Sequence, residues 1–425
     1  MGPDASKRDN LMDQVPSQKK FDWLTAGQFS FSLLIGLFLI GSSLVSYLLM
    51  TLRGAIAGIP VVDSQLGSSL LFSAGLGFAG TLMIPSIYYS GLSLFSKTSR
   101  EKRVWTGSGW LGFALPGLIV LGYLSQSNPS WGVFVLPLFH ILTNGAAIFW
   151  LLYVAKRKLP EESSQRFWGV FGSGLTLAPL IALIVELLIL VFFGILLWVF
   201  IQNQPELKQD FLILLDNFQQ SSITPDIFER TTRRLFETPG IIGGVFIYIA
   251  VLIPVVEELI KPIAIWLLLG RNLSPRDGFL LGAVSGAGYA LFENLTIAAE
   301  IDIWTFVMIS RLGTAAIHIL TTALVGWGIA SARTGKKYIR LLMTFIAAIT
   351  LHGVWNGLNI LTALVDFPPM QTTLGTFALN FARYAPAGLL ILALGALFGL
   401  FRVNSFFQRA IITQINLEKS EASWK

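Results

Sequence analysis

Long apolar stretches recur along the whole chain and limit the folds it can adopt. Hydrophobic residues make up 54% of the 425 residues and charged residues 13%, whereas about a quarter of a soluble domain is charged. A helix needs about 20 mostly apolar residues to cross the hydrocarbon of a bilayer, so we expect an all-α, polytopic transmembrane helix bundle of about ten helices. The predicted spans are residues 29–52, 66–95, 108–125, 131–154, 174–201, 241–269, 278–299, 303–331, 340–364 and 380–401.

The distribution of lysine and arginine predicts how this bundle is oriented. With the N-terminus inside, the inner loops and tails hold 22 of the 30 Lys and Arg residues and the outer segments hold six. Because cytoplasmic loops retain positive charge, we expect both termini in the cytoplasm. The net charge of +6 follows from this topology and gives no reason to propose nucleic acid as a partner. The absence of cysteine excludes disulfides and thiolate chemistry.

A polar stretch over residues 202–239 divides the spans into two groups of five. Its apolar side chains at helical spacing, among them Phe211, Leu215 and Phe218, predict one or two amphipathic helices on the outer surface. A solvated connector and a surface that recruits a substrate both fit this pattern. The expected organisation is a cytoplasmic tail (1–25), a first transmembrane region (26–201), the amphipathic loop (202–239), a second transmembrane region with the candidate site (240–401) and a cytoplasmic tail (402–425).

Several ionisable side chains lie inside the apolar spans of the second half. A charge at bilayer depth costs at least a few kcal/mol, so such residues normally face a polar interior and mark a functional site. Their positions near the middle of successive spans allow them to meet at one depth in the membrane. They are Glu257, Glu258 and Lys261 in the sixth span, Glu293 in the seventh, His318 in the eighth and His352 in the ninth, with Asn356 one turn after His352.

The sixth span combines three of these groups with two prolines. Glu257 and Lys261 are four residues apart and share a helix face, while Glu258 points about 100° away. Lys261 can therefore form an ion pair with Glu257, but neutralising one acid alone would leave Glu258 in need of a proton, a metal or a second partner. Pro254 can kink the helix upstream of the acids and free a backbone carbonyl.

Two histidines and a carboxylate are a common ligand set for a catalytic zinc ion with one position open to water. We expect Glu293, His318 and His352 to bind Zn²⁺, with Glu257 or Glu258 as the general base. Glu257, paired with Lys261, is slightly favoured as the base. A metal-free mechanism, in which a Glu and a His activate water directly, stays open.

Other signals narrow the chemistry. The chain contains neither a Gly-x-Ser-x-Gly elbow nor a His-Glu-x-x-His helix motif, which argues against serine and standard zincin mechanisms. Asn356 can donate a hydrogen bond to an oxyanion or orient His352. Glu186 and His140 in the first half are isolated, and a lone polar residue on a membrane helix more often bonds a neighbouring helix, so we leave both outside the site.

The residues of the cluster resemble those of a known group, the PrsW family of intramembrane proteases, which is related to the CAAX-processing and Abi membrane proteases. The resemblance covers roughly residues 245–360 and does not reach the first five spans. Where Phe is common in the family, four residues before the acid of the second motif, this chain has Tyr289. The matching segments are Val256–Lys261, Gly286–Asn294, Arg311 with His318, and His352–Asn356.

The resemblance implies a membrane peptidase, metal-dependent and located in the plasma membrane of a prokaryotic cell, with a membrane-anchored protein as substrate. It implies catalytic roles for the Glu pair, Lys261, Glu293 and the two histidines, and Asn356 matches the end of the related His-x-x-x-Asn pattern. A proton- or cation-coupled transporter would also place Glu, Lys and His at the midplane, but the chain shows no inverted repeat. An inactive scaffold with the same fold is the third alternative.

Overall fold

A computed structural model describes residues 22–57, 64–95, 108–128, 131–160, 162–219, 238–271, 273–297, 301–365 and 380–422. Within these ranges the chain is helical and contains no strand. The predicted tail over 1–25 therefore lies almost wholly outside the described residues, as does the second half of the predicted outer loop.

Helices follow one another through short connections along the chain. The first half contains α2 (Trp23–Ala57), α3 (Ser64–Thr81), α4 (Ile84–Phe95), α5 (Leu111–Gln126), α6 (Gly132–Lys156), α7 (Ser164–Gly172), the π-helix η1 (Ser173–Leu177), α8 (Ala178–Gln202) and α9 (Pro205–Gln219). The second half contains α11 (Pro239–Ile247), the π-helix η2 (Tyr248–Leu252), α12 (Ile253–Ile260), α13 (Ile263–Leu267), α14 (Pro275–Thr296), the short 3₁₀ helix η3 (Ile301–Ile303), α15 (Trp304–Gly335), α16 (Tyr338–Val365) and α19 (Ala385–Ala422).

The prediction of a polytopic helical bundle is confirmed. In the described part of the chain, eight helical segments are long and apolar enough to cross a membrane, and they coincide with eight of the ten predicted spans. The other two predicted spans correspond to α5, which has 16 residues, and α14, which has 22. A helix, α9, occupies the start of the predicted amphipathic loop. The last helix, α19, continues well past residue 402 into the predicted C-terminal tail.

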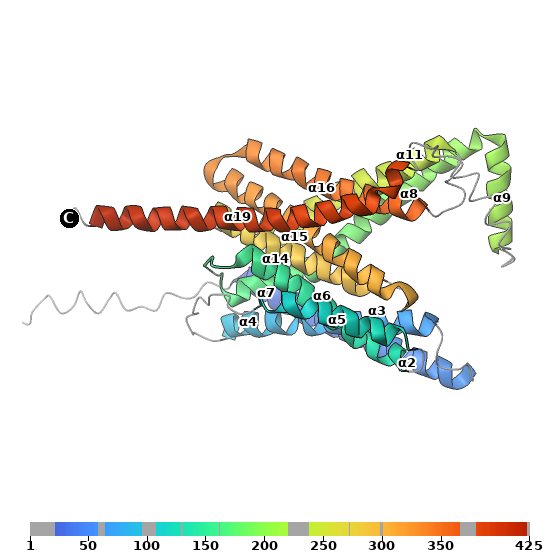
Figure 1. Cartoon of the computed structure of the whole chain (residues 1–425), viewed down its shortest axis with the longest axis horizontal. Coiled ribbons are helices and arrows are strands. Elements are labelled where there is room, and N and C mark those ends of the chain that lie inside the picture. Colours follow the sequence, from blue (N-terminus) through green and yellow to red (C-terminus); the bar gives the residue numbers. More distant parts are fainter. Residues whose placement is uncertain are drawn as a thin grey trace, which may run out of the picture.

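α14 lies at the centre of the bundle, between the helices of the first half and α15 (Figure 1). Its sequence is rich in Gly, Ala and Ser, and nearly every side chain from Gly278 to Leu291 is buried. A helix that other helices surround does not need a lipid-compatible surface, so its composition can serve close packing instead. This is why α14 is less apolar than the spans that face lipid, although it runs through the middle of the molecule.

Small residues on two faces of α14 set the distance to its neighbours. On one face, a Cβ atom at Gly282 would collide with the carbonyl of Thr322 on α15. On the other face, a Cβ at Gly288 would collide with the carbonyl of Phe171, where α7 runs into η1. Both contacts bring backbone against backbone. α14 is thereby held tightly between α15 and the first half of the chain.

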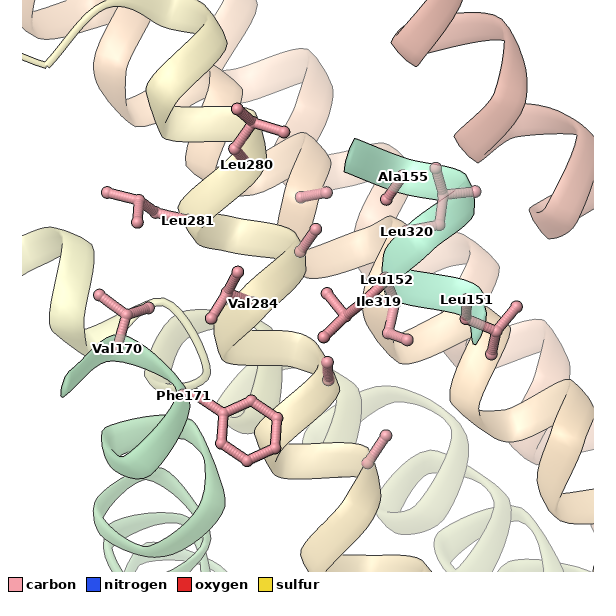
Figure 2. Close-up of a cluster of buried hydrophobic side chains, with 14 of the residues drawn as sticks. Leu151, Leu152, Ala155, Val170, Phe171, Leu280, Leu281, Val284, Ile319 and Leu320 are labelled. Carbon is pink, nitrogen blue, oxygen red and sulfur yellow. The ribbon is translucent and has the colours of Figure 1, made fainter. Parts of the chain in front are cut away.

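The largest buried cluster joins the two halves around this helix. Figure 2 shows Leu280, Leu281 and Val284 of α14 among side chains of α6, α7 and α15. Phe171 of α7 is fully buried in the same cluster. Residues of α2, α3, α6 and α7 in the first half therefore share one continuous core with the spans that carry the candidate site.

Candidate active site

The helix that supplies the Glu pair is interrupted twice. The π-helix η2 ends at Leu252, two residues before Pro254, and the helix breaks again at Lys261 and Pro262 before α13 begins. Proline has no N–H group and disturbs the helix one turn upstream, and π-bulges are frequent at functional sites. The expected irregularity at Pro254 is therefore present, in the form of a π-helix.

Lys261 contacts both acids of the pair. Its Nζ lies 2.8 Å from Glu257 Oε2 and 2.8 Å from Glu258 Oε1, and the lysine side chain is fully buried. The ion pair that the spacing of Glu257 and Lys261 allows is present, and the same ammonium group also reaches Glu258, because residues three and four apart on a helix are both neighbours. A single ammonium group is shared by two buried carboxylates.

Glu293 is held between two partners on α15. Its Oε1 lies 2.7 Å from Nη1 of Arg311, and its Oε2 lies 2.7 Å from Nε2 of His318. The other ring nitrogen of His318, Nδ1, lies 2.6 Å from Lys261 Nζ. The lysine donates this bond, so His318 carries its proton on Nε2 and donates it to Glu293. Nδ1 therefore keeps a lone pair that faces the lysine and the Glu pair.

His352 approaches the Glu pair from α16. Its Nδ1 lies 3.0 Å from Glu258 Oε1, which also accepts a hydrogen bond of 3.0 Å from the Thr321 hydroxyl. With Nδ1 as the donor, Nε2 keeps a lone pair, and it lies 3.8 Å from Glu257 Oε2. Glu258 is thus fastened through Oε1, while its buried Oε2 has no hydrogen-bond partner among the described residues.

The structure groups a different carboxylate with the two histidines from the one expected. One ligand atom from each of Glu257, His318 and His352 lies within 4.8 Å of the others, and all three side chains are buried. Glu293, the predicted ligand, instead has its oxygens bound to Arg311 and His318. A carboxylate on the far nitrogen of a ligating histidine is the usual outer support of a metal site, because it fixes the ring and its tautomer.

The donor set fits a divalent metal ion in chemistry and in charge. Two neutral imidazoles and a carboxylate suit zinc. When all groups are ionised, three carboxylates, on Glu257, Glu258 and Glu293, face two permanent cations, Lys261 and Arg311. The uncompensated negative charge in a buried site favours a further cation. For an ion to use Nδ1 of His318, the bond from Lys261 to that nitrogen must open.

Asn356 supports the backbone of the site. Its Nδ2 donates a hydrogen bond of 3.1 Å to the carbonyl of Ile249 in η2. One turn earlier on α16, Gly353 packs against the carbonyl of Ala250. Asn356 therefore holds α16 against η2, and within the described chain its side chain makes no hydrogen bond to His352 or to the Glu pair.

Two further side chains of α14 complete the enclosure. The Tyr289 ring lies 4.8 Å from Lys261 Nζ and 5.6 Å from the His318 ring, so it covers both in a cation–π and an edge contact. The Ser285 hydroxyl donates to the Lys261 carbonyl, where Pro262 interrupts the helix. Ser285 and Tyr289 are four residues apart, so the sequence could have predicted that they share the helix face of Glu293. Thr321 follows His318 by three residues on α15, and this spacing likewise predicts that the two side chains are neighbours.

These observations define an integral membrane protein of helical bundle type with a buried Glu, His and Lys site inside its second half. Residues 221–382 match the model of the PrsW family of intramembrane metalloproteases. The match includes every candidate site residue named above and confirms the resemblance seen in the motifs. No curated protein and no solved structure matches the chain.

The family match bears on function at the level of the class. A domain of the PrsW family supports intramembrane peptidase activity and the use of a metal ion. It also implies that the substrate is a protein in the membrane.

Proposed function

We propose that the chain is an intramembrane metallopeptidase that hydrolyses a peptide bond of a membrane-anchored protein at the Glu, His and Lys site. The observation that carries the proposal is the group of Glu257, His318 and His352, buried together in a domain that matches a metalloprotease family. These three residues hold the ion, and we infer that it is Zn²⁺. Bound zinc supplies Lewis acidity and lowers the pKa of a water molecule to near neutrality.

The side chains around this group provide the remaining functions. Glu258 has one oxygen fixed by Lys261, Thr321 and His352, and its free Oε2 is available to take a proton from water. The sequence slightly favours Glu257 as the base and Glu293 as the ligand. In this proposal Glu257 is the ligand, which its grouping with the histidines supports, and Glu258 is the base. Glu293 orients His318, and Arg311 balances the charge of Glu293.

The location of the site suits a substrate within the bilayer. The spans that surround it are apolar, and both the Glu pair and the histidines lie inside these spans. We propose that the chain lies in a prokaryotic plasma membrane with both termini in the cytoplasm, where the excess of Lys and Arg in the inner segments is retained.

The two roles of the Glu pair are separated by matched glutamine variants. We expect Glu257→Gln to lose bound zinc and cleavage together, because it removes an anionic ligand. We expect Glu258→Gln to retain zinc and lose cleavage by about 100-fold or more, the scale of general base catalysis. Zinc per chain is measured by mass spectrometry, and cleavage is measured on single-span reporter proteins reconstituted in liposomes with the purified protein. Loss of zinc from Glu258→Gln with retention in Glu257→Gln would reverse the assignment.

A further inference from the structure

Glu186 is an acid within a membrane span of the first half. It lies outside the region of the family match and is not one of the proposed metal ligands. It lies in the middle of α8, outside residues 221–382. Its side chain is half-buried, and its Oε1 atom is fully covered and has no hydrogen-bond partner among the described residues. A covered acceptor without a donor is costly, and its retention points to a partner that is not part of the chain itself.

The packing of α8 directs this acid toward the candidate site. Ala178 and Ala182 pack against Tyr289, whose ring covers Lys261. Glu186 follows Ala182 by four residues and so lies on the same face of α8, one turn further along. Glu186 therefore lies one helical turn beyond Ala182, which packs against Tyr289 at the site.

Two other contacts bring the backbone of α8 at Glu186 near the segment that carries the Glu pair. The backbone carbonyl of Glu186 accepts a hydrogen bond of 3.2 Å from the Tyr248 hydroxyl of η2, the π-helix that precedes the Glu pair. α8 also packs against α12, the helix that carries Glu257 and Glu258. Glu186 therefore lies on a helix that borders the segment with the Glu pair.

The opposite face of α8 looks away from the protein. Leu188, two residues after Glu186 and about 200° around the helix, has 66% of its surface exposed. Ile184 and Val191 are also more than half exposed. In a bilayer these side chains contact lipid. On this side, α8 alone lies between the site and the hydrocarbon.

We propose that Glu186 is a substrate-positioning residue, whose carboxyl group turns to accept a hydrogen bond from a backbone N–H in the unwound segment of a membrane-spanning polypeptide that enters beside α8. This inference rests on the proposed function. A substrate helix must unwind before its peptide bond is attacked, and each N–H released in a nonpolar environment costs several kcal/mol unless it finds an acceptor. Lysine and arginine side chains cannot serve, since they lack an acceptor.

Photo-crosslinking tests the contact without requiring turnover. A benzoylphenylalanine is placed at position 186, or at position 188 as the lipid-facing control, in a Glu258→Gln background, and the protein is reconstituted with the single-span reporters. The expected result is a crosslink from position 186 to residues within the membrane span of a reporter, at least about tenfold stronger than from position 188. Equal crosslinking from the two positions, or none from position 186, would overturn the proposal.

Kinetics on a cleaved reporter test the hydrogen bond. Glu186→Leu removes the acceptor at similar size, and we expect it to raise KM by about tenfold with little change in kcat, the effect of one lost hydrogen bond. Glu186→Gln keeps a carbonyl acceptor and should remain within about twofold of wild type. Leu188→Ala is the matched control on the lipid face. A Glu186→Leu variant with unchanged KM would also overturn the proposal.

The two experiments separate failure of this inference from failure of the proposed function. If the wild-type protein cleaves no reporter, the peptidase assignment fails, and the crosslinking comparison still decides whether Glu186 faces a bound polypeptide. If cleavage depends on Glu258 and not on Glu186, the peptidase assignment stands and the role of Glu186 falls.

Discussion

Replacing His352 with alanine is expected to abolish peptide cleavage, with a loss of at least about a thousandfold, while the protein remains folded in the membrane. The imidazole is one of three metal-compatible ligands, and its Nδ1 also fastens Glu258. Its loss removes a ligand and releases the proposed base, and each of these effects alone costs about 100-fold or more.

The measurement is the cleavage rate on the single-span reporters beside the thermal unfolding temperature in detergent. His140→Ala is the matched control, since His140 is a fully buried histidine of α6 that accepts a hydrogen bond from Trp304 and lies outside the site. Cleavage retained in His352→Ala, or lost equally in both variants, would remove the site assignment.

Replacing Lys261 with methionine is expected to destabilise the fold by about 3–5 kcal/mol, because it leaves two carboxylates without their shared cation. Lys261 is fully buried and lies 2.8 Å from an oxygen of each acid. The penalty arises from the uncompensated charges and not from lost packing, since methionine fills a similar volume. A second substitution, Glu258→Gln, should therefore restore much of the lost stability in the double variant without restoring cleavage.

Unfolding of the purified protein in detergent measures this effect. Arg271→Ala is the control, because its ion pair with Asp22 is more than 40% exposed on both sides and such pairs contribute less than about 1 kcal/mol. If Lys261→Met unfolds at the wild-type temperature, Lys261 does not neutralise the Glu pair.

The sequence predicts the membrane topology class and the members of the polar cluster because both depend on simple rules. Apolar runs of sufficient length give the spans, and a charged side chain in such a run has to face a polar partner. This reasoning brings Glu257, His318 and His352 to one place, as the structure shows. Each of these residues is identified from its depth in the membrane and its charge.

Which of these residues contact one another depends on the directions of their side chains. The depth of a residue in the membrane does not define that direction. The sequence predicts Glu293 beside both histidines as a ligand, but its side chain meets Arg311 and His318 at the edge of the site. Glu257 reaches the histidines instead, on α12, which lies between η2 and the break at Pro262 and packs against α15 and α16. Such a rotation follows from helix packing across the whole bundle.

The contribution of the first half of the chain to the candidate site is the hardest part to predict from the sequence. Glu186 is isolated among apolar residues, and its neighbours on α8 carry no motif. Its relation to Tyr289 depends on η1, which packs backbone against backbone on α14 through Gly174 and Gly288. A contact between segments about 100 residues apart in the sequence is set by the tertiary fold.

Metal content is the measurement that tests the central claim most directly. Wild-type protein and a His318→Ala/His352→Ala variant are purified in parallel, washed with a mild chelator and analysed by mass spectrometry for bound metal. The account predicts about one zinc ion per wild-type chain and essentially none in the variant, because two of three ligands are removed. Wild-type protein without bound metal, or with zinc that survives both substitutions, would contradict a metal site at Glu257, His318 and His352.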